Sequence, residues 1–520
     1  MLRASRWTVL AALCLAVFVV NLATTVVNIG LPSLVSELDA STGDLLWIVD
    51  AFNLAFAALV LAGGSLSDRF GRRRALLIGL AGFAATSLAG AWSGNPDVLI
   101  AWRAATGVFA AVIFPVTLSI LTNVFEDRRE RATAIGIWGA ATGLAVALGP
   151  VTGGALVEHF WWGSILVFNG LVAVAALGFA VLVVPDSRDP ETPPLDVRGL
   201  VLSSAGLGLL VHAIIQAPER GWGSTTSLVA FAAAVVVLFV FVLQERRTEH
   251  PMLDVALFKN MRFTAASSAI AFAFFAMFGF IFLVTQYFQF VRGYGPLEAG
   301  LRTLPVATSI AIGAVVGTPL AVRLGSKLVV AGGLLSLTVA FTWISLITDH
   351  TSYGQIVGQM AFLGIGIGLV SSPATEAIMG VVPAAKAGIG SAVNDATREL
   401  GGTLGVAVIG SVALSLYRDH LTSARIPPET AAAARESIGG ALEAARRVAE
   451  SGQADAALKL TTVAKDGYLD GMAAGCLVAA GVALLGALLT IAFLPSHPGT
   501  PDATPDPDRP LHPAARHAAA

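Results

Sequence analysis

The sequence predicts an all-α polytopic membrane protein, and three observations support this fold class. Hydrophobic residues make up 55% of the 520 residues and charged residues only 13%, and the mean hydropathy is +0.76. The apolar residues fall into stretches of roughly 17 to 25 residues, the length at which a helix spans a bilayer. A loop motif in the first part of the chain recurs in the second part. Such a chain requires lipid as its solvent.

Fourteen apolar stretches are long enough to span a bilayer. We expect spans at residues 7–29, 43–65, 75–93, 97–123, 132–156, 164–184, 199–217, 225–244, 263–288, 300–321, 328–348, 354–380, 387–416 and 471–494. The first stretch follows Arg3 and Arg6, as a signal peptide would. It is long enough to span, however, lacks a convincing cleavage site, and is followed by many similar stretches, so we interpret it as the first span.

Positive charge predicts the orientation, because Lys and Arg in short loops stay in the cytoplasm. The basic side carries Arg69, Arg72, Arg73, Arg74, Arg128, Arg129, Arg131, Arg188, Arg198, Arg246, Arg247, Lys259, Arg262, Arg323, Lys327 and Lys386. The opposite short loops carry only Arg220, Arg292 and Arg302. We expect an inner (plasma) membrane protein with both termini in the cytoplasm. The long segment 417–470 would lie outside, with surface helices such as Thr430 to Glu450, and the tail 495–520 would be a disordered cytoplasmic segment.

The recurring motif predicts two equivalent halves. The loop after the second span contains Gly64, Leu66, Asp68, Arg69, Gly71, Arg72 and Arg73. The Leu, Arg, Gly and final basic positions return 254 residues later, at Leu320, Arg323, Gly325 and Lys327. We therefore expect six-helix bundles at 1–184 and 263–494, and linkers with two inserted spans at 185–262. Paired six-helix halves around a midplane site are one way in which transporters build alternating access.

Several motifs resemble those of the major facilitator superfamily. The first loop matches its signature, Gly143 to Gly154 resembles its antiporter motif, and Leu99 to Gly107 resembles its fourth-helix motif, with Thr106 where glutamine is common. Segments 47–51, 293–300 and 394–402 are similar to the fourteen-helix drug:proton antiporter branch. Over about residues 7 to 494, the resemblance implies a major facilitator fold of two six-helix bundles plus two inserted helices. It also implies proton-coupled efflux of hydrophobic or cationic drugs, or similar amphipathic molecules, by alternating access, with the proton motive force in place of a cofactor.

Two motifs are candidates for gating. In the first, Gly64, Asp68, Arg69, Gly71 and Arg72 would form a latch between helix ends, with Gly71 allowing a tight turn. The alternative is retained positive charge that only sets topology. In the second, Gly149, Pro150, Gly153 and Gly154 would allow close helix approach and a bend at a moving interface. The alternative is ordinary small-residue packing.

Ionisable side chains inside spans are costly and therefore indicate functional sites. This chain places Asp50, Arg103, Glu376, Asp395, Arg398 and Glu399 there. Asn53 shares a helix face with Asp50 at i+3, and Arg103 could neutralise Asp50 or a substrate anion. In the thirteenth span the polar residues Ser391, Asn394, Asp395, Arg398 and Glu399 share one face.

Asp50 and Glu399 are the candidates for proton coupling. Arg398 is expected to pair with Asp395, which leaves Glu399 as the carboxylate that exchanges protons. Burial favours the neutral form of a carboxylate and a nearby cation favours the charged form, so a proton and a cationic substrate compete for one site. The alternative is that these residues form structural ion pairs.

The first span departs from the drug-antiporter pattern, which usually has an aspartate where this chain has Ala23. A polar stripe of Asn21, Thr24, Thr25 and Asn28 remains, either as a cavity wall or as hydrogen-bonding contacts between helices. In the ninth span, six phenylalanines favour core or lipid contact over a cavity lining: Phe272, Phe274, Phe275, Phe278, Phe280 and Phe282.

We expect a monomer whose partners are a small-molecule substrate, protons and the lipid bilayer, without nucleic acid, metal ligands or catalytic residues. A close alternative keeps the fold but exports one endogenous lipid or natural product. Another is a receptor or membrane enzyme that transports nothing. Against an enzyme or ATP-driven transport, the sequence lacks G-x-S-x-G, H-E-x-x-H and P-loop patterns.

Overall fold

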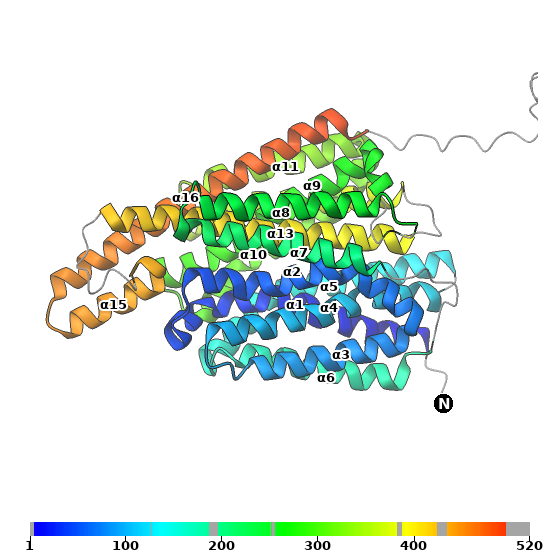
Figure 1. Cartoon of the computed structure of the whole chain (residues 1–520), viewed down its shortest axis with the longest axis horizontal. Helices are drawn as coiled ribbons and strands as arrows, with labels where there is room; N and C mark the ends of the chain where they lie inside the picture. Colours follow the sequence, from blue (N-terminus) through cyan, green and yellow to red (C-terminus); the bar gives the residue numbers. More distant parts are fainter. Residues whose placement is uncertain are drawn as a thin grey trace, which may run out of the picture.

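The computed structural model is a bundle of long helices that lie side by side along one common direction (Figure 1). It describes residues 5–125, 127–186, 196–249, 251, 255–381, 387–423 and 434–495. All regular structure within these residues is helical. The tail expected to be disordered lies outside them, apart from its first residue.

The helices follow one another with short connections. In chain order they are α1 (Arg6–Leu38), α2 (Thr42–Phe70), α3 (Arg72–Gly90), α4 (Pro96–Val124), α5 (Arg128–His159), α6 (Ser164–Val183), α7 (Val197–Arg220), α8 (Thr225–Glu245), η1 (Val255–Lys259), α9 (Met261–Gln286), η2 (Tyr287–Val291), α10 (Pro296–Leu324), α11 (Ser326–Ile344), α12 (Tyr353–Met379), α13 (Ala387–Ser423), α15 (Ile438–Glu450) and α16 (Ala454–Phe493).

Thirteen of the described helices are long and apolar enough to cross a membrane. The fourteenth long helix, α3, packs against α4 and α6 like its neighbours. Its first residues are Arg72, Arg73 and Arg74, and their charges lower its mean hydropathy. The described chain is therefore a multi-pass helical membrane protein. It has a long helix at each of the fourteen stretches that the sequence predicts, and thirteen of these helices qualify as spans by length and hydropathy.

Local sequence explains where the helices begin. Ser41 and Asp44 form a capping box at α2, Asn95 caps α4, and Ser352 with Gln355 caps α12. We use two names for the ends of the bundle. The Ser41 end is where α1 passes into α2, and the Gly71 end is where α2 passes into α3.

The packing of the helices repeats in the two halves. In the first half α1 packs on α5 and α6, α2 on α4, and α3 on α4 and α6. In the second half α9 packs on α13 and α16, α10 on α12, and α11 on α12 and α16. The contacts between the halves repeat as well, since α2 packs on α13 and α5 on α10. The two halves are thus equivalent six-helix bundles.

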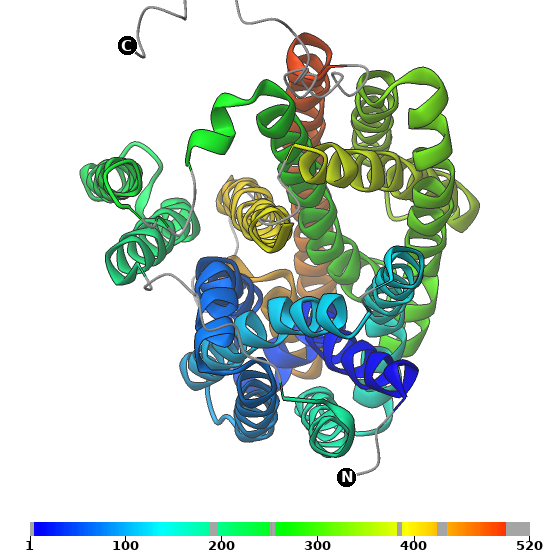
Figure 2. The same ribbon diagram turned by 90° about the vertical axis from the view of Figure 1, so that its right-hand side faces the viewer.

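The inserted helices α7 and α8 lie to one side of the two halves (Figure 2). They pack on each other, and α7 also contacts α2 and α13. They therefore flank one of the two contacts between the halves.

The segment expected outside the membrane is more helical than predicted. Helix α13 continues to Ser423 and α16 begins at Ala454, so both extend well beyond the predicted limits of 416 and 471. Together with α15 they project from the Ser41 end of the bundle (Figure 1). Hydropathy locates apolar stretches and therefore misses the polar continuation of a helix.

Candidate functional site

The two halves meet at the Ser41 end through glycines. Gly300 of α10 lies against the backbone of Pro150 in α5, and a Cβ on Gly154 would meet the backbone of Pro296 and Leu297. On the other side of the molecule, a Cβ on Gly410 of α13 would meet the Leu46 side chain of α2. At Gly300 and Gly154 the facing atoms belong to the backbone, so these two contacts require glycine, whereas at Gly410 the facing atoms are the flexible end of the Leu46 side chain.

Hydrogen bonds join the halves at the same end. Gln289 Nε2 donates to the Ile29 carbonyl at 2.8 Å, and the Leu297 amide donates to Glu158 Oε2 at 2.9 Å. The segment before α15 takes part, since Thr42 Oγ1 donates to the Glu436 carbonyl at 2.6 Å. The Ser41 end is therefore closed by contacts that cross between the halves.

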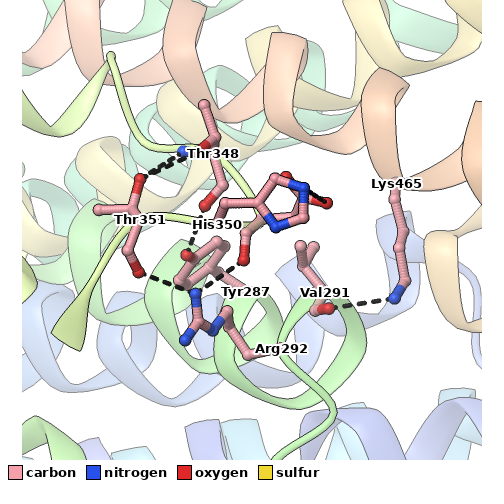
Figure 3. A network of polar contacts seen from close by, with 8 residues as sticks. Tyr287, Val291, Arg292, Thr348, His350, Thr351 and Lys465 are labelled. Carbon is pink, nitrogen blue, oxygen red and sulfur yellow. Dashed lines mark hydrogen bonds and ion pairs between the residues drawn. The ribbon is translucent and has the colours of Figure 1, made fainter.

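A polar network holds the second half together beside this contact (Figure 3). Arg292 Nη1 donates to the carbonyls of Asp349 and Thr351 at 2.7 and 2.8 Å, and the Tyr287 hydroxyl donates to the Thr348 carbonyl at 2.8 Å. Lys465 of α16 donates to the Val291 carbonyl at 3.1 Å. The network fixes η2 against the α11–α12 loop and α16.

Helix α15 presents a charged face next to this end. Arg446 Nη2 donates to Glu443 Oε1 at 2.8 Å, and this contact lowers the pKa of the Glu443 carboxyl. Both residues lie outside the membrane-spanning segments. A lowered pKa keeps Glu443 ionised in mildly acidic surroundings, so the pair persists there.

The loop motif lies at the Gly71 end. Gly71 has a φ of 103° between α2 and α3, and Gly325, its counterpart in the repeat, has a φ of 87° between α10 and α11. Both sharp turns use a conformation that favours glycine. Gly64 packs on Pro115, and Arg73 Nη2 donates to the Val181 carbonyl at 2.8 Å.

The latch itself cannot be placed from these contacts. Asp68 and Arg69 lie in the last turn of α2, but their side chains are outside the described part of the structure. Arg72 lies in the first turn of α3. The latch therefore stays a prediction.

The glycine motif of α5 makes contacts on both sides. Gly149 lies against Thr25, and a Cβ on Gly153 would lie 2.7 Å from the Val26 carbonyl and from Ile29, so both glycines face α1. Gly154 faces the other half. Nearer the Gly71 end, Gly143 has no atom within 4 Å of a Cβ position among the described residues. The motif is thus tightly packed towards the Ser41 end only.

Asp50 and Asn53 are completely buried in α2. Neither carboxylate oxygen of Asp50, and neither polar atom of the Asn53 side chain, has a hydrogen-bond partner among the described residues. Buried polar atoms are nearly always paired, so such a group calls for an explanation. Side chains that have no partner among the described residues are available to a proton, water or a substrate.

Arg103 does not neutralise Asp50. Its Nε donates to the Ile48 carbonyl at 3.0 Å and its Nη1 to the Ala23 carbonyl at 3.3 Å. The guanidinium also lies over the Phe52 ring, 4.5 Å from its centre. Nη2 has no partner within the described residues. The side chain joins α4 to α1 and α2 in this way.

The polar stripe of α1 bonds to its own helix. Asn21 donates to Val17, Thr24 to Asn21, Thr25 to Leu22, and Asn28 to Thr24, in each case to a backbone carbonyl three or four residues earlier. No side-chain hydrogen bond in this set joins two helices within the described chain. Asn28 Oδ1 is buried and has no described partner.

The polar face of α13 also contacts a neighbouring helix. Arg398 Nη2 donates to Thr375 Oγ1 of α12 at 3.1 Å, and the guanidinium carbon of Arg398 lies 5.1 Å from the Phe274 ring centre. The expected pairing of Arg398 with Asp395 stays a prediction. Asn394 donates to Asp395 Oδ1 at 3.4 Å. The Glu399 Oε2 atom is buried without a described partner, and the Ser391 side chain is outside the described structure.

The phenylalanines of α9 serve packing. The rings of Phe278 and Phe282 each lie against a glycine of α13, and the Phe280 ring meets the Phe341 ring edge-on. Phe275 is buried as well, and its backbone lies against Gly405. Phe272 lies against Gly486 of α16. These rings pack in the core, as the sequence favours.

The two candidates for proton coupling lie on helices that contact each other. Asp50 lies on α2 and Glu399 on α13, and these helices pack together between the halves. Sequence reasoning missed Thr403, which is 1% exposed on α13 and whose hydroxyl has no hydrogen-bond partner among the described residues. Its spacing of four residues from Glu399 was the available signal.

The chain matches a known protein family over most of its length. Residues 13–406 match the family model described as Major Facilitator Superfamily. The chain is similar to the multidrug efflux pump LfrA of Mycolicibacterium smegmatis, with 37% identity over 94% of this chain and 96% of that protein. It is 33% identical to the tetracenomycin C resistance and export protein of Streptomyces glaucescens, over 94% and 92% of the two chains. It is 32% identical to the methyl viologen resistance protein SmvA of Salmonella typhimurium, over 85% and 89%.

Solved structures show the same fold. A bacterial homologue of the human lysosomal transporter Spinster, in an inward-facing and unoccupied conformation, superposes with a TM-score of 0.68. The match covers 95% of this chain and 99% of that one at 18% sequence identity. At this identity the likeness concerns the fold alone.

Proposed function

Because the chain belongs to the major facilitator superfamily, we propose that it exports hydrophobic or cationic drugs, or similar amphipathic molecules, in exchange for protons. Relatives matched over nearly their whole length are named as multidrug efflux and drug resistance proteins. The fourteen long helices among the described residues, which include the two inserted ones, favour the fourteen-helix drug:proton antiporter branch. The chain acts as a transporter, and no enzymatic step is proposed.

The observation that supports this proposal is the presence of two carboxylates on the helices that join the halves, the fully buried Asp50 and the partly buried Glu399. Asp50 and Glu399 sit on α2 and α13, and the unpaired oxygens of both lack a donor among the described residues. A charge within the bilayer costs a few kcal/mol unless it is neutralised. A proton neutralises such a carboxylate, and so does a cationic substrate, but both together leave an excess positive charge. This competition couples proton entry to substrate release.

The contacts at the Ser41 end supply the second element of the proposal. The basic loops lie at the Gly71 end, so the positive-inside rule favours a cytoplasmic location for that end and for both termini. The chain would then be an inner membrane protein closed towards the outside. Separation of the glycine contacts at the Ser41 end would open it outward, which is the movement that alternating access requires.

Reconstituted vesicles with an imposed pH gradient test this function. The wild type should accumulate tetraphenylphosphonium, a lipophilic cation, against its gradient while the internal pH changes in step. Asp50→Asn and Glu399→Gln should each lower coupled transport at least about tenfold. Absence of substrate-linked proton flux in the wild type would refute antiport, and unchanged coupling in both variants would refute the assignment of these residues.

A second candidate is the export of one natural product. The substitution at Ala23 and the similarity to a tetracenomycin C exporter favour it. A panel of lipophilic cations and neutral polyketides separates the two functions, because a dedicated exporter would confer resistance to one compound class only.

A further inference from the structure

The contact between α2 and α13 fixes the register of these two helices. Leu46 meets Gly410 near the Ser41 end, and Ala396 of α13 belongs to the apolar cluster of the first half. The helices run antiparallel, since α2 begins and α13 ends at the Ser41 end. Positions four, seven and eleven residues from the contact on either helix therefore face the opposite helix. We call these facing surfaces the α2–α13 seam.

Polar residues occupy the facing positions. On α2, Asp50 and Asn53 are four and seven residues from Leu46, and on α13, Thr403 and Glu399 are seven and eleven residues from Gly410. At about 1.5 Å per residue, Asn53 and Thr403 lie at the same depth, and Asp50 and Glu399 are separated along the helix axes by about 10 Å. Asn53 and Thr403 thus occupy the depth between the two carboxylates.

The same four side chains have unpaired atoms. Both polar atoms of Asn53 and the hydroxyl of Thr403 are buried without a hydrogen-bond partner in the part of the chain that the structure describes, as are both Asp50 oxygens and Glu399 Oε2. Threonines in helices usually donate to a carbonyl three or four residues earlier, as Thr285 does at 2.8 Å. A buried hydroxyl without that bond is available to a neighbour across the seam.

On these grounds we propose that Thr403, with Asn53, forms a relay that passes the proton between Asp50 and Glu399 along the α2–α13 seam. The inference rests on the proposed proton exchange. A hydroxyl both accepts and donates, so Thr403 Oγ1 takes a proton from the Asp50 side, through water where the side chains do not touch, and releases its own towards Glu399. One proton moves from a carboxylic acid to a carboxylate, and the hydroxyl is restored. Asn53 orients the chain of donors.

Other ionisable groups lie on the helices that pack around the seam. Arg103 of α4 donates to the carbonyls of Ile48 and Ala23. His212 of α7 packs beside Trp47, and Arg398 of α13 donates a hydrogen bond to Thr375. Asp395 lies on α13 one turn beyond Glu399. Arg103, His212 and Arg398 thus each contact a partner other than the four seam residues.

Stopped-flow measurement of proton release tests the relay. Purified full-length protein in weak buffer with a pH dye is mixed with tetraphenylphosphonium, and the rate and amount of released protons are recorded. Thr403→Val should slow release at least about tenfold without changing the final amount, because a relay alters the rate and not the equilibrium. Thr403→Ser should restore the rate, and Thr285→Val, which removes a hydroxyl bonded within its own helix, should match the wild type.

The contradicting outcomes differ from one another. An unchanged rate in Thr403→Val, or equal slowing in Thr403→Ser, would overturn the relay. A changed final amount in Thr403→Val would overturn it too, because Thr403 would then belong to the proton-binding site. Absence of release from the wild type at any time would refute the proton exchange on which the relay rests.

Discussion

At the scale of the residue, Arg103 shows how a buried charge can be held without a carboxylate. Two backbone carbonyls and the Phe52 ring surround it, and one of the carbonyls belongs to Ala23. The pattern of the drug:proton antiporter branch usually has an aspartate where this chain has Ala23. The Nη2 atom of Arg103, which has no described partner, lies in the same neighbourhood.

A double-mutant cycle tests whether a carboxylate in place of Ala23 would pair with Arg103. Ala23→Asp should be tolerated with Arg103 present, since the new carboxylate gains a guanidinium partner, and strongly destabilising in an Arg103→Gln background. The coupling free energy should be about 1 kcal/mol or more, measured from thermal unfolding of the purified protein in detergent. A coupling near zero would show that the two side chains do not meet.

Asp50 provides a second test at this scale. A buried carboxylate without a partner costs stability that a neutral amide does not, so Asp50→Asn should leave the thermal midpoint unchanged or raise it by a few degrees. Coupled transport should fall in the same variant. A lower midpoint would mean that Asp50 stabilises the fold, and a structural role would then explain the loss of transport.

Residue types and spacing could predict part of this site. They single out Asp50, Glu399 and Arg103, because charge within a span is rare. They cannot predict that Arg103 donates hydrogen bonds to backbone carbonyls or that Arg398 donates one to Thr375. Spacing along one helix does not say which groups a neighbouring helix presents. Thr403 was missed although its spacing from Glu399 was a signal, because a threonine in a span is unremarkable until its hydroxyl is seen without a partner among the described residues.

At the scale of the element, the turns at Gly71 and Gly325 give a paired prediction. Both have positive φ, at 103° and 87°, so Gly71→Ala and Gly325→Ala should each cost about 1–2 kcal/mol of stability. Gly332→Ala in α11 is the control, because that glycine lacks a positive φ and a Cβ would meet no atom within 4 Å. Thermal midpoints of the three variants check this, and equal midpoints would contradict it.

The elements themselves were largely predictable from the sequence. Apolar length located the long helices, and the repeat of the Gly71 loop at Gly325 predicted the equivalence of the halves, which the matched helix packing confirms. The extensions of α13 and α16 beyond the apolar stretches were not predictable in this way. They are polar helices stabilised by packing, with Tyr417 donating to the carbonyls of Ala434 and Ser437.

At the scale of the whole molecule, the glycine contacts at the Ser41 end hold the two halves together. Leu46→Cys with Gly410→Cys, in a background without Cys14 and Cys476, places thiols on either side of one contact. A short bifunctional thiol reagent with a reducible link should stop transport by more than about 80%, and reduction should restore it. Each single cysteine with the same reagent is the control. Continued transport by the cross-linked protein would show that the halves need not separate there.

The central claim is that protons and a cationic substrate compete for Asp50 and Glu399. The most direct measurement is the number of protons released when tetraphenylphosphonium binds to the purified protein at equilibrium, across a range of pH. The wild type should release at least one proton per substrate bound, and the Asp50→Asn, Glu399→Gln double variant should release none while still binding substrate more weakly. Equal proton release from the wild type and the double variant would contradict the account.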